Sequence, residues 1–308
     1  MDWIVSVIAA SLAVAAPLLY GALGEIFTQR SGIMNLGLEG VMLVGAASSY
    51  IAAVNSQSLF VALLTCILVG LVLGFLYALL TVTLQANQTV CGLAMVIFGQ
   101  GLSGTIGKAY AGIATPVSFA KTAIPGLKSI PVLGEILFSQ DILIYALYIL
   151  VPLAFIYIYK TRPGMRLRAL GENPGALDAM GYKVSAMRYL YVMAGTAITA
   201  LGGMYISLCY TPSWTDNITA GKGWIAGALV IFASWNPLMA AFGSFLFGLI
   251  QVVGLRLQLT DVNISSYFLN MLPYIFTIIV LIITTGGFLK KRSSGPAMVG
   301  KTYSREDR

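Results

Sequence analysis

Long apolar runs separated by short polar stretches make up most of this chain of 308 residues. A helix needs about 20 apolar residues to cross the hydrocarbon core of a bilayer. The pattern therefore predicts an all-α, polytopic transmembrane helical bundle of about nine membrane segments, in a range of about eight to ten because segment ends are uncertain by several residues. The predicted segments are Trp3–Leu23, Leu36–Val54, Leu59–Leu84, Val90–Gly107, Ile142–Tyr159, Tyr189–Cys209, Trp224–Trp235, Leu238–Leu257 and Tyr267–Phe288.

Two of these segments differ from an ordinary internal span. Trp224–Trp235 is shorter than the others and precedes the tight turn Asn236-Pro237, which is typical of a re-entrant or broken helix. The chain opens Met1-Asp2-Trp3, which has no positive charge, and the apolar run to Leu23 is a full span. We therefore expect it to be the first transmembrane helix and not a cleavable signal peptide.

Charges are few, and their positions predict the orientation. Only 9% of residues are charged, against roughly a quarter in a soluble domain. Of 18 Lys and Arg, 12 lie in two places, which are Lys160, Arg162, Arg166, Arg168, Lys183 and Arg188, and Lys290, Lys291, Arg292, Lys301, Arg305 and Arg308. Lys and Arg are retained in the cytoplasm, so both places are expected there.

This orientation defines the predicted domains. Residues 1–288 form one membrane domain, in which 160–188 is a cytoplasmic loop, 108–141 is an external loop rich in Pro and Gly, and the N-terminus lies outside. Residues 289–308 form a cytoplasmic polar tail. The net charge of +7 does not indicate nucleic-acid binding, because the basic residues flank apolar spans.

Polar residues between the first two spans are candidates for a translocation path. Glu25, Arg30, Asn35 and Glu39 lie in a stretch whose glycines permit a broken helix. In that interpretation Asn35 and Glu39 line the path. The alternative is an interfacial stretch in which Glu25 and Arg30 pair in solvent and Glu39 lies near the lipid head groups.

A second segment resembles this one and suggests an internal repeat with broken helices. Gly37–Ala46 and Gly221–Ala228 both place glycines and one charge at the start of a span. Paired, glycine-interrupted segments often mark the binding site of a transporter. We therefore add Trp224 to the predicted path, with the alternative that this residue belongs to the aromatic belt at the membrane surface.

The cytoplasmic loop contains a short capped helix. Asn173 can cap it, Pro174 fits its first position, and Gly181 can end it. A short apolar helix displayed on a membrane protein is suited to partner docking. The residues expected to contact a partner are Gly171, Glu172, Asn173, Pro174, Leu177, Met180 and Gly181.

Several kinds of chemistry are excluded. The chain has no histidine, and Cys66, Cys91 and Cys209 are scattered in apolar stretches, which excludes a zinc site or a Cys–His nucleophile. No G-x-x-x-x-G-K-[ST] motif occurs, so the chain itself does not bind ATP through a P-loop. An integral membrane enzyme would also need a paired acid–base set, which we do not find.

Five motifs together resemble a known family. They are Arg168–Gly181, Ser31–Gly40, Thr219–Ala226, Leu255–Gln258 and Gly295–Tyr303. They are similar to the ABC-transporter permeases of the ribose and branched-chain amino acid class. The closest resemblance is to the sub-group that works with basic-membrane-lipoprotein receptors, usually nucleoside importers.

The resemblance implies one of two different permease subunits of an importer in a bacterial inner membrane. Its partners would be cytosolic subunits that bind ATP and an extracytoplasmic lipoprotein receptor, and this chain would be neither an enzyme nor the holder of a cofactor. Nucleoside, ribose-like sugar and other small polar solutes stay open. A stand-alone secondary transporter or channel is the competing class, but it would need ionisable residues for ion coupling, and only Glu39 is a serious candidate.

Overall fold

The structure is a computed structural model that describes residues 2–258 and 295–304, with single positions 271, 272, 275, 278, 279 and 282. Within these residues the secondary structure is helical, which confirms the all-α prediction. The helices are α1 Asp2–Arg30, α2 Leu38–Ser56, α3 Leu59–Ala78, α4 Gln88–Gly107, α5 Leu133–Leu137, α6 Ile142–Lys160, α7 Arg162–Glu172, α8 Pro174–Ala179, α9 Val184–Tyr205, α10 Lys222–Phe232 and α11 Pro237–Gln258. Single π turns extend α3 over Leu79–Thr83 and α9 over Ile206–Tyr210.

By length and composition, seven described helices can cross a membrane, and each matches a segment expected from the sequence. The expected count of about nine is not confirmed. One predicted segment forms α10, whose 11 residues span about 16 Å and are too short to cross. The last predicted segment, Tyr267–Phe288, lies outside the described residues apart from the single positions named above.

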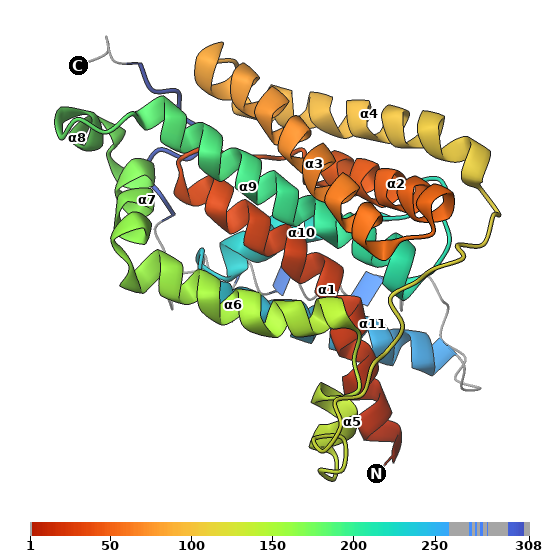
Figure 1. Ribbon diagram of the computed structural model, residues 1–308. Helices are drawn as coiled ribbons and strands as arrows, with labels where there is room; N and C mark the ends of the chain where they lie inside the picture. The colour runs from red at the N-terminus through yellow and green to blue at the C-terminus, as the bar shows by residue number, and fades with distance from the viewer. Residues whose placement is uncertain are drawn as a thin grey trace.

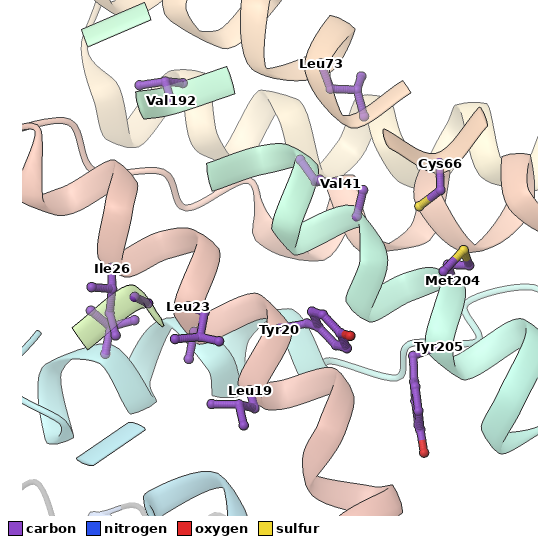
Figure 2. Close-up of a cluster of buried hydrophobic side chains, with 14 of the residues drawn as sticks. Leu19, Tyr20, Leu23, Ile26, Val41, Cys66, Leu73, Val192, Met204 and Tyr205 are labelled. Atoms are coloured by element: carbon purple, nitrogen blue, oxygen red, sulfur yellow. The ribbon is translucent and has the colours of Figure 1, made fainter. Parts of the chain in front are cut away.

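The core of the bundle is built around α9, which packs against α1, α2 and α3. Figure 2 shows the side chains that meet there, among them Tyr20 of α1, Val41 of α2, Cys66 of α3 and Met204 of α9. Small residues bring the backbones close. A Cβ on Gly45 of α2 would lie 2.6 Å from the carbonyl oxygen of Ala200 in α9. Close backbone contact of this kind is the usual way in which membrane helices associate.

The two ends of the bundle differ in character (Figure 1). The N-terminus lies beside α5 at one end, and α7, α8 and residues 295–304 lie at the other. The loop 108–141 is irregular as expected from the sequence, apart from one 3₁₀ turn and the five-residue α5. Backbone hydrogen bonds from Thr122 to Gln140 (2.9 Å) and from Ile124 to Phe138 (3.0 Å) order it.

Candidate functional site

The helix break between α1 and α2 lies where the glycines predicted it. After Arg30 the chain turns at Gly32, whose φ is +87°, and helix resumes at Leu38. Asn35 is buried in the break, where its Oδ1 accepts a hydrogen bond from the backbone N–H of Gly37 (2.8 Å). This local bond replaces part of the helical ladder that the break removes.

Buried polar groups surround the break. The Oε1 atom of Glu25 accepts from the side chain of Gln29 (2.8 Å) and from the backbone N–H of Asn35 (2.9 Å). Arg30 instead donates to the hydroxyl of Tyr159 (2.9 Å) and to the backbone oxygen of Trp235 (3.2 Å). The alternative in which Glu25 and Arg30 pair in solvent therefore does not fit the structure, because Glu25 is buried and Arg30 has other partners.

Glu39 connects the two glycine-containing segments. Its Oε1 accepts from the hydroxyl of Thr219 and from the N–H of Gly221 (2.8 Å), and its Oε2 accepts from the N–H of Gly223 (2.6 Å). The carboxylate, 4% exposed, thus caps the N-terminus of α10, where a negative charge also opposes the helix dipole. The two segments that we paired from the sequence are in direct contact.

The three residues predicted for a path have different environments. Glu39 of α2 is buried against the start of α10. Trp224 lies in the first turn of α10, and 42% of its surface is exposed. Asn35 lies within the break, against Glu25 and Gly37. The structure therefore brings Glu39 and the turn before Trp224 together, while Asn35 supports the break.

The capped helix expected within residues 160–188 is α8. As the sequence predicts, the Oδ1 of Asn173 accepts from the N–H of Ala176 (3.1 Å), Pro174 occupies the first turn, and the chain leaves the helix through Gly181 with φ +82°. The apolar residues of α8 and Met180, which directly follows this helix, differ in exposure. Leu177 is 2% exposed and packs in the core of this chain, whereas Met180 is 67% exposed.

This division narrows the surface that a partner could contact. Gly171, Pro174 and Leu177 face the chain's own body and hold α8 in place. The exposed members of the predicted set are Glu172, Asn173, Met180 and Gly181. The side chain of Leu177 is already covered by this chain's own residues.

A family model described as the permease component of branched-chain amino acid transport systems matches residues 7–285. This chain belongs to that family. Similar relatives include the guanosine ABC transporter permease protein NupQ of Bacillus subtilis, 35% identical over 96% of each chain. The nucleoside ABC transporter permease protein NupC of Lactococcus lactis is 34% identical over 94% of this chain and 95% of its own. TsgC13 of Haloferax volcanii, provisionally named as a glucose ABC transporter permease, is 29% identical over 99% of each.

Sequence reasoning missed one helix of the loop 160–188 of this permease. α7 precedes α8, and Thr161 caps it by accepting from the N–H of Gly164 (3.1 Å), with Pro163 in its first turn. The Thr-x-Pro pattern is a cap signal of the same type as Asn173-Pro174 and could have identified this helix.

The packing of the permease's tail was also missed. Residues 295–304 of the tail contact α7, where the backbone N–H of Met298 donates a hydrogen bond to the backbone oxygen of Gly171 (2.9 Å). The hydroxyl of Tyr303 donates to Asp178 of α8 (3.3 Å), and the side chain of Gln88 in α4 donates to the oxygen of Lys301 (3.2 Å). Residues 295–304 thus lie across α7 and α8. A polar composition alone carries no signal for such contacts.

Proposed function

We propose that this permease is the membrane-spanning subunit of an ATP-driven importer and forms part of the path for a nucleoside. The observation that carries the proposal is α8, a capped helix anchored by Leu177 that presents Met180 at one end of the bundle. A stand-alone transporter or channel has no need of such an element. The nucleoside assignment is supported by NupQ and NupC, which are similar to this chain over nearly its whole length.

The proposal includes partners and an orientation. A second, different permease subunit completes the path, cytosolic subunits bind and hydrolyse ATP, and an extracytoplasmic lipoprotein receptor delivers the solute. We place the chain in a bacterial cell membrane. The clustered Lys and Arg support an orientation with α7, α8 and the tail in the cytoplasm and the N-terminus outside.

Within this chain we assign the coupling surface to the exposed part of α8 and its flanks. Trp224 lies on the path, Glu39 holds the half-helix α10 beside it, and Asn35 holds the break that precedes α2. Half-helices of this kind, with ends inside the membrane, are the usual place of a transported solute.

A sugar such as ribose or glucose is the second candidate solute, because TsgC13 is similar over the full length of the chain. The test is ATP-dependent uptake by the complete complex in proteoliposomes, with its own ATP-binding subunit, second permease and receptor. We expect uptake of labelled guanosine or uridine, competed by unlabelled nucleosides and not by ribose or glucose. A complex whose ATP-binding subunit cannot hydrolyse ATP is the control, and equal uptake by that complex would contradict the proposal.

A further inference from the structure

A non-helical segment of this chain, Thr211–Gly221, enters the membrane region along α4. Its Trp214 lies against Gly107 at the end of α4, and a Cβ on Gly104, one turn earlier, would lie 3.4 Å from the Oδ1 of Asp216. Its Thr219 donates to Glu39 in the first turn of α2. The segment therefore follows α4 from its end toward the middle of the bundle.

The depth of this segment follows from α4 itself. Gly99 of α4 contacts Gly40 of α2, the residue after Glu39. Eight residues separate Gly99 from Gly107, which corresponds to about 12 Å along a helix. The other end of α4 is fixed at the cytoplasmic side by the bond from Gln88 to Lys301. Thr219 thus lies well inside the span of α4.

Polar groups of this segment are exposed on the surface of the chain. Thr215, Asp216 and Asn217 are exposed, and so are Gln100 and Thr105 on the adjacent part of α4. Asp216, beside Gly104, lies within the last turn of α4, whereas Gln100 is level with the contact between Gly99 and Gly40 and so lies deep in the span. An exposed polar side chain at the depth of Gln100 is found only where protein or a water-filled cavity faces it. The deep part of this face therefore does not contact lipid.

The exposed face of α4 changes character along its length. Toward the cytoplasmic end it carries Val90, Leu93, Ile97 and Phe98, which are apolar. From Gln100 onward the same face carries small and polar residues, and a Cβ on Gly101 would meet no atom within 4 Å. The change lies at the level where α2 and α10 begin, because the neighbouring Gly99 contacts Gly40.

The backbone of the segment holds its side chains in a fixed arrangement. Asn217 and Ala220 have φ values of +53° and +47°, a conformation that non-glycine residues rarely adopt. It is held by hydrogen bonds from the N–H of Ala220 to the oxygen of Asn217 (2.9 Å) and from the N–H of Asn217 to the Oδ1 of Asp216 (3.0 Å). Unusual backbone of this kind is concentrated at ligand sites.

We propose that Thr215, Asp216 and Asn217, together with Gln100, Thr105 and Trp224, form the solute-contacting wall that this chain contributes to the path. This proposal rests on the proposed function and identifies the surface that contacts the solute during import. Amide and hydroxyl groups can pair with the polar edge of a neutral solute, and the carboxylate of Asp216 can accept from its N–H or O–H groups. The half-exposed indole of Trp224 can stack on a flat ring. This combination fits a nucleobase better than a sugar, which has no flat aromatic face.

The first test measures access of water to the wall. In the complete complex, with Cys66, Cys91 and Cys209 replaced by alanine, single cysteines are introduced as Gly101→Cys, Asn217→Cys and Ile97→Cys. A membrane-impermeant thiosulfonate reagent is applied with and without ATP and vanadate. We expect labelling of the first two variants in at least one condition and none of Ile97→Cys, which lies on the same face one turn toward the cytoplasm. Absence of labelling at both 101 and 217 would contradict the proposal that these residues line the path.

The second test measures uptake. Gly101→Phe fills the open space beside the wall and should lower nucleoside uptake about tenfold, equivalent to about 1.4 kcal/mol in the barrier, with the amount of complex unchanged. Ile97→Phe is the matched control and should leave uptake near the wild-type rate. Asn217→Gly keeps the left-handed backbone and removes only the amide. Uptake should fall here too, and wild-type uptake in this variant would show that the amide does not contact the solute.

The two tests separate failure of the wall from failure of the proposed function. If the wild-type complex imports nucleosides but neither 101 nor 217 is labelled, the wall is wrong and the proposed function stands. If both positions are labelled but the wild-type complex imports only sugars, the path is in place and the nucleoside assignment is wrong.

Discussion

Glu39 illustrates how a single carboxylate can fix the position of a half-helix. Both of its oxygens accept bonds from the start of α10, and a glutamine at this position would turn an NH₂ group toward a backbone N–H. Leaving a buried donor unpaired costs about 1–3 kcal/mol. Glu39→Gln should therefore lower the melting temperature of the purified complex and reduce uptake.

Glu25→Gln is the matched control for this prediction. Only the Oε1 of Glu25 has hydrogen-bond partners among the described residues, and its Oε2 has none there. Glutamine keeps the oxygen that accepts both bonds, and its NH₂ group replaces an oxygen that already has no partner there, so the melting temperature should fall less than in Glu39→Gln. Equal destabilisation by the two substitutions would mean that the cap on α10 has no special role.

Asn35 should act through stability and not through solute contact. Asn35→Leu removes the acceptor for the N–H of Gly37 inside the break and should cost about 1–3 kcal/mol of stability. We expect a lower melting temperature and less complex in the membrane, while uptake per assembled complex stays close to wild type. A normal amount of complex with strongly reduced uptake would instead place Asn35 on the path.

At the scale of elements, α8 has an inner and an outer face with different roles. Met180→Asp changes only the exposed face, so the permease should insert normally while stimulation of ATP hydrolysis by the loaded receptor is lost. Met165→Asp on α7, also exposed, is the control and should keep stimulation. Undiminished stimulation in Met180→Asp would remove α8 from the coupling surface.

Leu177→Asp tests the inner face of α8 and should impair the stability of the permease, in contrast to Met180→Asp. The side chain is covered by this chain, and an unpaired charge in such a place costs several kcal/mol. The amount of permease in the membrane should fall, as measured by immunoblot of membrane fractions. A normal amount of protein would mean that Leu177 is not an anchor.

The tail is an element that connects α7 and α8 with the end of α10. Gly295 lies against the ring of Trp235, whose Nε1 donates to Gln29 of α1 (2.6 Å). Gly295→Leu should collide with this ring and release the segment, which hydrogen exchange of residues 295–304 would detect as faster exchange. Lys301→Ala, at an exposed position, is the control and should leave exchange unchanged. Unchanged exchange in Gly295→Leu would show that the contact does not hold the tail.

At the scale of the whole molecule, the two ends of the bundle should lie on opposite sides of the membrane. A reporter inserted at residue 175 is expected to be cytoplasmic and one at residue 120 external, because the basic residues of the α7–α8 region are retained inside. Alkaline phosphatase and a fluorescent protein as paired reporters would measure this. An external signal at residue 175 would reverse the orientation and move the coupling surface to the wrong side.

What could be predicted from the sequence is what depends on neighbouring residues. Seven apolar runs form spans because each is long enough to satisfy its own backbone in lipid. The ends of α8 were predicted because Asn173 and Pro174 act within one turn of the chain. The break after Arg30 follows from glycines in the same stretch.

Tertiary structure decided the role of each polar residue, because that role depends on partners far away in the chain. Glu39 is a cap only because Thr219 to Gly223 fold back onto it, and Leu177 is buried only because the body of the bundle covers it. The polar face from Gln100 to Asn217 exists only where α4 meets a returning segment more than a hundred residues later in the chain. Hydropathy measures transfer into lipid and does not distinguish which face meets protein, lipid or water, and in this permease that choice is made by packing.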